Sequence, residues 1–364
     1  MIILDFIVNI GGDAKPQPTG QRDHRDFDAV VPPQLVVKRR RSGAAVGLHG
    51  RQNNGHGAAH RFGHADLRPP GRRQQFGRLA DQFMVAALQG DAARHRVTNW
   101  TLERDKPVDG KSDVLSYPDW NVNGVQPVDT VPNSVYATML PGLLKENGYF
   151  TIHCGKAHYG AIGTPSADPL NCGFDVNIAG HAAGGPGSYL GTENFGNNEK
   201  GGYTPPWGVP GLEKYHGDSI FLTEALTREA LSTLDKVKPS GKPFYLYMSH
   251  YAVHIPLYAD QRYYEKYLDM GLNEAEARYS SMIEGMDKSL GDIMDWLDRN
   301  GLAENTVILF MSDNGGFSLR PRAGELHTHN KPLKSGKGSA YEGGIREPMI
   351  VRWPGKVQPG TRCS

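Results

Sequence analysis

The sequence predicts an α/β protein with a mostly parallel central sheet flanked by helices. Three short apolar runs, at residues 149–154, 243–248 and 306–311, are typical of buried strands. Between these runs the chain carries segments whose apolar residues recur at helical spacing. Because strands alternate with helices along the chain, a doubly wound sheet is the expected architecture.

Helical spacing predicts three helices in chain order. The first covers residues 134–147 and is closed by Gly148. The second is capped by Asp218 and Ser219. Its apolar face consists of Leu222, Ala225, Leu226, Ala230 and Leu234. The third is a long helix that stops at Gly301. Its apolar stripe, which we expect to face the core, consists of Met282, Met286, Leu290, Ile293 and Leu297.

The composition excludes several classes of protein. The formal net charge is only +1, so no global field favours nucleic acid as a partner. Three cysteines are too few for a disulfide framework, and no apolar run is long enough to span a bilayer. Residues 1–10 are apolar but are interrupted by Asp5, and they lack a basic region and a cleavage-site pattern. We therefore expect no signal peptide, and the localisation stays open.

The first 91 residues differ in composition from the rest of the chain. They contain no Glu and no Tyr, and Arg far outnumbers Lys. Such a segment buries little apolar surface, which predicts a disordered leader over residues 1–91 and a globular domain over residues 92–364. Two alternatives stay open: a nucleic-acid arm around Lys38–Arg41, and translation out of the natural reading frame.

Polar clusters follow each of the three predicted strands. The first strand leads to Lys156 and His158, the second to His254, and the third to Asp313 and Asn314. In open α/β sheets, ligands bind beyond the carboxyl ends of the strands. The three clusters are therefore expected to meet in one pocket.

The residue types in these clusters suit a cation and an anion. Asp313 and Asn314 offer the hard oxygen ligands that Ca²⁺ or Mg²⁺ prefers, although the same residues are also common in plain turns. Lys156 and His158 point the same way if their segment is extended, and could then hold an anionic ester. The alternative is a surface lysine beside a histidine satisfied in the core.

A glycine-dense loop precedes the last apolar run, Met349–Val351. Its glycines are Gly336, Gly338, Gly343 and Gly344. Glycines allow close backbone approach, and the loop also carries Lys334 and Lys337, a composition that suits an anion.

In this order and spacing the motifs resemble the sulfatase family, whose members hydrolyse sulfate esters. The matching segments are Gly155–His158, His254–Pro256, Asp313–Gly315, Gly336–Gly344 and Trp353–Gly355. Two further segments, Ala92–Trp100 and Gly173–Gly180, look like a bacterial arylsulfatase-like subgroup. The resemblance covers residues 92 to the C-terminus and implies an alkaline-phosphatase-like fold.

The resemblance also implies roles for the site residues. Asp313 and Asn314 would bind a divalent cation, usually Ca²⁺ with Mg²⁺ as the alternative. Lys156 and Lys337 would bind the sulfate oxygens. The substrate would be a sulfated small molecule, such as an aryl ester, or a sulfated polysaccharide.

Two histidines complete the implied site: His158 would assist the nucleophile, and His254 would donate a proton near the leaving group. The family nucleophile is a formylglycine made from Cys or Ser in a Cys/Ser-x-Pro-x-Arg motif, which this sequence lacks. A single Asp13 stands where the family has an adjacent pair, and the chain ends soon after the Trp-Pro-Gly segment. We therefore expect a sulfatase-like fold that is incomplete at both ends.

Three functions follow as hypotheses. The first is a sulfuric ester hydrolase whose activity is impaired because the nucleophile motif is absent. The second is a phosphoesterase of the same fold, since a metal, lysines and histidines also stabilise a transferring phosphoryl group. The third is a catalytically inactive anion-binding protein.

Overall fold

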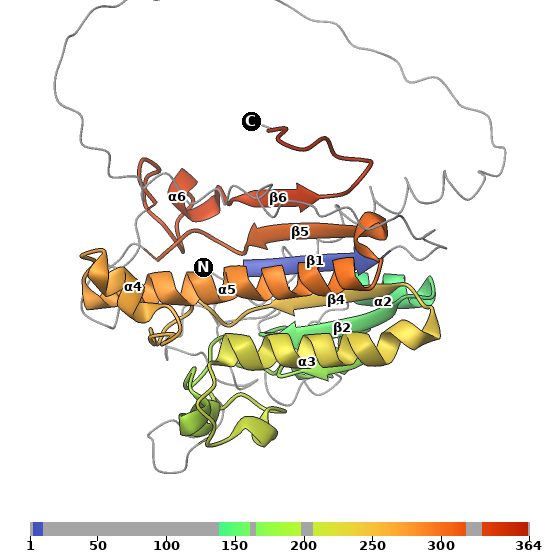
Figure 1. The fold of residues 1–364 in the computed structure, drawn as a ribbon, viewed down its shortest axis with the longest axis horizontal. Coiled ribbons are helices and arrows are strands. Elements are labelled where there is room, and N and C mark those ends of the chain that lie inside the picture. Colours follow the sequence, from blue (N-terminus) through green and yellow to red (C-terminus); the bar gives the residue numbers. More distant parts are fainter. Residues whose placement is uncertain (1–2, 10–137, 161–164, 198–206, 318–329, 363–364) are drawn as a thin grey trace, which may run out of the picture. The chain divides into compact units, whose positions relative to one another are not determined.

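The computed structural model describes residues 3–9, 138–160, 165–197, 207–317 and 330–362. Six strands of this part of the chain form one sheet in the order β3-β2-β4-β1-β5-β6 (Figure 1). The strands are β1 Ile3–Asn9, β2 Phe150–Gly155, β3 Val176–Ile178, β4 Phe244–Ser249, β5 Thr306–Ser312 and β6 Met349–Arg352. The apolar runs of the sequence form β2, β4 and β5, as predicted.

Four of the strands run in one direction. β2 pairs in parallel with β3 and with β4. β1 is antiparallel to both β4 and β5, so β4 and β5 point the same way. β6 is antiparallel to β5 at the end of the sheet. The α/β class is confirmed, with β1 and β6 opposed to the other strands.

The strand β1 belongs to the segment that the sequence analysis assigned to a leader. It lies between β4 and β5, where Ile7 faces Leu246 on one side and Ile308 on the other. Ile7 is fully buried, as expected for a β-rich apolar run with partners on both edges. The average composition of 91 residues concealed this short run. Residues 10–91, with Asp13 and Lys38–Arg41, and the segment Ala92–Trp100 lie outside the described residues.

Three of the five α-helices in the described residues were predicted, and the two short ones at Tyr264–Asp269 and Glu342–Ile345 were not. The α-helices are α2 Leu140–Glu146, α3 Leu222–Val237, α4 Tyr264–Asp269, α5 Glu274–Arg299 and α6 Glu342–Ile345. Short 3₁₀ helices lie at Pro165–Ala167, Pro169–Cys172, Gly191–Gly196, Glu213–Tyr215, Lys238–Ser240 and Ala303–Asn305. The long helix α5 begins at the cap residue Asn273, whose side chain accepts a hydrogen bond from the Glu276 N–H at 2.9 Å. Gly301, at φ +68°, follows its end as predicted.

Two predicted helix starts were wrong. Among the described residues α2 begins at Leu140, next to Pro141, whose ring suits the first turn. The helix α3 begins at Leu222 after Phe221, and neither Asp218 nor Ser219 caps it. The Leu222 N–H donates instead to the Tyr189 carbonyl at 2.8 Å, and Phe221 pairs with Leu190 in a short bridge. This bridge keeps the chain extended up to Phe221.

The helices α3 and α5 lie side by side along the sheet (Figure 1). Every predicted apolar residue of α3 is buried, and so are Met282, Met286, Ile293 and Leu297 of α5. Leu290 is only partly buried. Burying one such side chain contributes about 1.5–3 kcal/mol, so these two stripes are a main source of the stability of the sheet layer.

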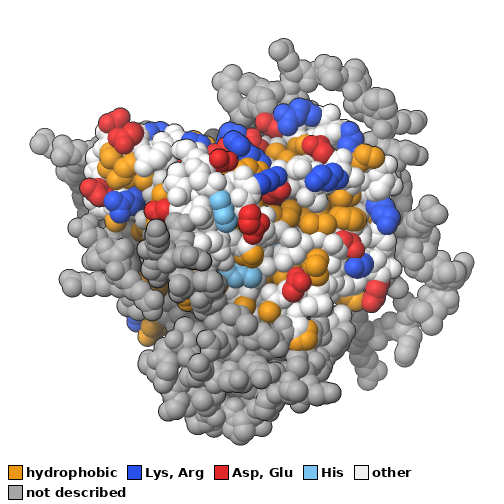
Figure 2. Space-filling model, turned by 90° about the horizontal axis from the view of Figure 1, so that it is seen from below, with side chains coloured by type: hydrophobic (Ala, Val, Ile, Leu, Met, Phe, Trp, Pro, Cys, Tyr) orange, Lys and Arg blue, Asp and Glu red, His pale blue; other side chains and the backbone are white. Residues whose placement is uncertain are grey.

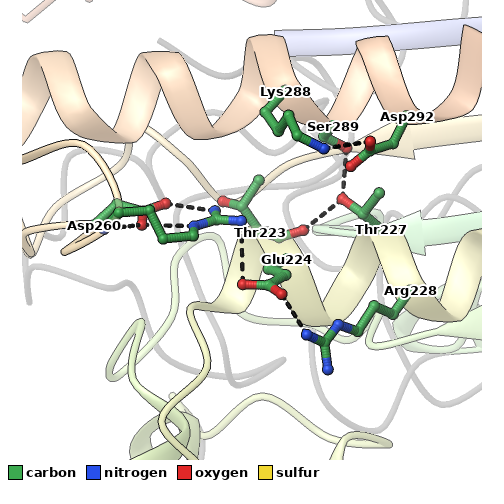
Figure 3. A network of polar contacts seen from close by, with 9 residues as sticks. Thr223, Glu224, Thr227, Arg228, Asp260, Lys288, Ser289 and Asp292 are labelled. Carbon is green, nitrogen blue, oxygen red and sulfur yellow. Dashed lines mark hydrogen bonds and ion pairs between the residues drawn. The ribbon is translucent and has the colours of Figure 1, made fainter.

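A polar network joins α3 to α5 and to the segment before α4 (Figure 3). Arg262 donates to both carboxylate oxygens of Asp260, at 2.9 and 2.6 Å, and forms an ion pair with Glu224 of α3 at 3.1 Å. Thr227 of α3 donates to the Thr223 carbonyl at 2.7 Å, and its Oγ lies 2.6 Å from the Ser289 Oγ of α5. The Asp260 side chain is 1% exposed and that of Arg262 is 33% exposed, so the carboxylate of this bidentate pair is the buried partner.

Removing the buried carboxylate is expected to destabilise the protein. Asp260→Ala leaves Arg262 without its bidentate partner, and we expect a loss of about 2 kcal/mol in the free energy of unfolding. Arg228→Ala is the matched control, because Arg228 forms an exposed ion pair with Glu224 within α3 and should cost about 0.5 kcal/mol or less. Urea unfolding of both variants checks the difference, and equal losses would contradict it.

The surface of the described residues carries both signs of charge. On the face in Figure 2, acidic and basic side chains are interspersed, with histidine side chains between them. None of the helices in the described ranges is long and apolar enough to cross a membrane.

Candidate active site

The end of β2 places a lysine in the interior. Gly155 has φ +108°, and a Cβ there would lie 1.9 Å from the Ser249 carbonyl oxygen of β4, so only glycine fits. The Lys156 N–H then donates to the Ser249 carbonyl at 2.7 Å, and the Ser249 hydroxyl donates to the Lys156 carbonyl at 2.6 Å. The Lys156 side chain is only 7% exposed. The alternative of a surface lysine is therefore wrong.

His158 follows Lys156 in a left-handed backbone conformation, at φ +56°. Its N–H donates to the His181 carbonyl at 3.0 Å. The premise of an extended segment, on which Lys156 and His158 would point the same way, is therefore wrong at His158. The ring lies against Gly184, where an added Cβ would be 2.8 Å from the ring carbon Cε1.

His254 lies in the loop after β4 with a defined tautomer. Its Nδ1 is 2.8 Å from the Ile255 carbonyl oxygen. A carbonyl oxygen can only accept, so Nδ1 carries the proton and Nε2 of the neutral ring keeps its lone pair. The Tyr189 hydroxyl lies 2.7 Å from the Tyr251 carbonyl oxygen and 2.9 Å from that of His254, which holds the loop in place.

The pKa of His254 is affected by the charges of two lysines, Lys156 and Lys337. Burial is the largest cause that lowers the pKa of His254, and together with the positive charges of Lys156 and Lys337 it brings this pKa to about 3. Lys156 follows β2 and Lys337 lies in the glycine-dense loop, so two distant segments act on one imidazole. A site that holds two cationic groups beside a neutral histidine is suited to an anion.

The Asp313–Asn314 segment contacts the same loop. The Lys337 N–H donates to the Gly316 carbonyl at 3.0 Å, and the Gly315 N–H donates to the Gly344 carbonyl at 3.1 Å. A Cβ at Gly315 would lie 1.8 Å from the Gly343 carbonyl oxygen, so the two backbones are in close contact. The backbone of Lys337 is thus hydrogen-bonded to the segment that carries the predicted metal ligands. Its side-chain charge also lowers the pKa of His254.

The oxygen atoms around Asp313 fit a hard cation in their chemistry. Asn314 Oδ1 is buried and has no hydrogen-bond partner among the described residues, and the same holds for Glu347 Oε1. Burial and the nearby charge of Asp313 raise the pKa of Glu347 to about 7. The described residues contain no group of three or more His, Cys, Asp or Glu side chains that could hold a metal. Asp313 and Asn314 therefore form at most part of a ligand set.

The glycine-dense loop shows why its glycines are needed. A Cβ at Gly343 would lie 2.3 Å from the Ser335 carbonyl oxygen, and one at Gly344 would lie 2.3 Å from that of Ser339. Lys334 lies over the Tyr341 ring, with its Nζ 3.9 Å from the ring centroid. Of the two lysines in the loop, Lys337 is therefore the one whose charge reaches His254.

The described cysteines do not supply a nucleophile. Cys154 and Cys172 are free and buried. Burial raises the pKa of the Cys172 thiol to about 12 and raises that of Cys154 as well, so both stay protonated at neutral pH. Cys363 lies outside the described residues.

Sequence analysis missed three residues that shape this site. Gly184 and Gly185 contact the rings of His158 and His254, and Tyr189 binds the backbone of the His254 loop. The signal for the first two was the glycine-rich stretch at residues 180–187, which follows β3. Tyr189 gave no signal, because a buried tyrosine cannot be told from other core aromatics in one sequence.

Comparison with known proteins identifies the family. A family model for sulfatases matches residues 116–362. Arylsulfatase J of Mus musculus is 34% identical over 232 residues, which cover 62% of this chain and 36% of that protein. The N-acetylgalactosamine-6-sulfatase of Mus musculus is 32% identical over 240 residues, which cover 63% of this chain and 42% of that protein.

A solved structure is also similar. Ps i-CgsB, in complex with k-i-k-neocarrahexaose, matches with a TM-score of 0.52 and 32% identity, over 65% of this chain and 52% of that chain. The chain spans between 36% and 42% of the length of the two mouse relatives. The predicted alkaline-phosphatase-like fold is confirmed by this likeness. Because the family model matches more than half of its residues, this chain belongs to the sulfatase family.

Proposed function

We propose that this chain binds a sulfate ester between Lys156 and Lys337, and that its reaction class is the hydrolysis of that ester. The observation that carries the proposal is the burial of Lys156 at the end of β2, and the charges of Lys156 and Lys337 both act on His254. The positive charges of two lysines from separate segments act on one neutral imidazole, and a bound anion would offset both charges.

Each residue would have a separate task. Lys156 and Lys337 bind the non-bridging sulfate oxygens, and His158 assists the nucleophile. His254 would lie near the leaving oxygen, but in the tautomer that the Ile255 carbonyl favours its Nε2 is a hydrogen-bond acceptor. To donate a proton to the leaving group it must first be protonated. A bound anion favours this, because its negative charge offsets the two lysines.

Asp313 and Asn314 would hold the divalent cation, which we take to be Ca²⁺. Such an ion supplies positive charge beside the sulfate oxygens. The support is the carboxylate of Asp313 together with the unpartnered Asn314 oxygen. One charged and one neutral oxygen ligand bind a hard cation weakly, so the ion would be lost readily on dialysis against a chelator.

The substrate class follows from the relatives. One is named for N-acetylgalactosamine-6-sulfate, and a similar structure is a complex with a neocarrahexaose. We propose a sulfated saccharide as the natural substrate, with an aryl sulfate as the alternative that the name of Arylsulfatase J supports. A phosphate ester is the second candidate, because lysines accept sulfate and phosphate equally as point charges.

Turnover by this chain as written is expected to be negligible. Covalent catalysis needs its nucleophile, the family motif for formylglycine is absent, and the described cysteines stay protonated. An assay of the purified chain with an aryl sulfate and added Ca²⁺ checks this against the Lys337→Ala variant. Turnover by the unaltered chain well above that of the variant would show that a nucleophile exists elsewhere in the chain.

A further inference from the structure

We propose that Gly184 and Gly185 are positioning residues, which set the rings of His158 and His254 by leaving room for them. The inference rests on the proposed function of the two histidines. Each glycine serves one ring: a Cβ at Gly184 would lie 2.8 Å from Cε1 of His158, and one at Gly185 would lie 2.6 Å from Nδ1 of His254. Real Cβ atoms do not approach so closely, so a side chain at either position must displace the ring.

Gly184 and Gly185 are glycines because a Cβ would overlap a histidine ring, and not because their backbone conformation requires glycine. Neither Gly184 nor Gly185 has a positive φ, so an alanine could adopt both backbone conformations. Gly155 and Gly338 differ, because their φ angles are +108° and +85°. At Gly184 and Gly185, therefore, the position of the histidine ring is what a methyl group would change.

The backbones that carry the two rings are held by hydrogen bonds. The backbone of His158 is fixed by its hydrogen bond to the His181 carbonyl. The His254 N–H donates to the Tyr251 carbonyl at 2.9 Å, and the Tyr189 hydroxyl binds the carbonyls of both residues. Tyr189 is fully buried and lies in the same segment as the two glycines. Residues 184–189 thus hold the His254 ring on one side and its backbone on the other.

Gly185 has the more specific effect of the two. It covers the Nδ1 side of His254, with hypothetical Cβ distances of 2.6 Å to Nδ1 and 2.9 Å to Cε1. This is the side on which Nδ1 donates to the Ile255 carbonyl. A methyl group at residue 185 would press on this side of the ring and disturb the hydrogen bond that sets the tautomer. Gly185 thereby preserves the arrangement in which Nδ1 donates and Nε2 keeps its lone pair.

The test compares Gly185→Ala with Gly291→Ala by nitrogen-15 NMR of the histidine rings and by sulfate titration. Gly291 lies in α5 with nothing within 4 Å of its added Cβ, and it is the matched control. We expect Gly185→Ala to remove the Nδ1-protonated signal of His254 and to weaken sulfate binding on the order of tenfold. Gly291→Ala should change neither, and Gly184→Ala should shift the signals of His158.

A double mutant keeps the proposal testable if Gly185→Ala does not fold. In a His254→Ala background the space of the ring is free, so Gly185→Ala should then cost no stability. If Gly185→Ala unfolds the protein equally in both backgrounds, or leaves the His254 tautomer and sulfate affinity unchanged, the inference is wrong. If the His254 signal responds but no variant binds sulfate, the positioning role stands and the proposed function fails.

Discussion

Replacing Lys337 by alanine is expected to raise the pKa of His254 and to weaken sulfate binding about tenfold or more. Burial is the largest cause of the low pKa, and the charges of Lys156 and Lys337 add to it. Removing one charge leaves the burial, so the pKa rises but stays below its ordinary value. A charge-assisted hydrogen bond contributes about 1.5–3 kcal/mol, which corresponds to a loss of at least tenfold in affinity.

Lys334→Ala is the matched control for this variant. Both lysines lie in the glycine-dense loop, but the Lys334 ammonium lies over the Tyr341 ring. Removing it takes the same charge from the same loop without touching His254. NMR titration of His254 and calorimetric titration with sulfate measure the two effects. Equal losses of sulfate affinity in both variants would mean that general charge, and not a built site, attracts the anion.

The folded protein is also expected to lose stability steeply as the pH falls below 6.5. Burial lowers the pKa of His181 and of His250 to about 4, and that of His254 to about 3, from the ordinary value of 6.5. Between these values the unfolded chain binds protons that the folded protein does not. Unfolding then takes up protons, so acid favours it.

The size of the effect follows from the number of histidines. Each one destabilises the folded state by about 1.4 kcal/mol per pH unit within its window. Glu347 works in the opposite direction, because its raised pKa favours the protonated folded form below about 7. Asp287, whose pKa is raised by burial and by the charge of Glu284, acts in the same direction as Glu347, and the three histidines outweigh these two carboxyl groups. Urea unfolding at pH 7 and pH 5 measures the slope, and His250→Gln should make it shallower. An unfolding free energy that is the same at both values would contradict the expectation.

The periodicity of the sequence predicted the sheet layer well. Leu226 and Leu234 of α3 and Ile293 of α5 are fully buried, as their spacing indicates. Such stripes can be read from one sequence because a helix repeats every 3.6 residues and its core face must be apolar. The central strand β1 could not be read in this way. Its partners are separated from it by more than 230 residues, and local composition says nothing about them.

The electrostatic link between candidate residues could be predicted where strand ends carry polar residues, but the local backbone conformation at His158 could not, and the roles of these residues stay a prediction. Lys156, His254 and Lys337 were expected in one pocket because of their places in the chain, and the electrostatics of His254 link all three. The left-handed conformation of His158 was not expected, because non-glycine residues rarely adopt it. The predicted cap at Asp218 also failed for a reason that the local sequence does not contain. Phe221 pairs with the distant residue Leu190, and this pairing sets the start of α3.

The most direct test of the central claim is the pKa of His254, measured by NMR with and without saturating sulfate. If Lys156 and Lys337 form an anion site around this imidazole, bound sulfate offsets their charges. The pKa of His254 should then rise by roughly one unit or more, and it should rise less in Lys337→Ala. A pKa of His254 that is unchanged by saturating sulfate would contradict the claim that these residues form a sulfate site.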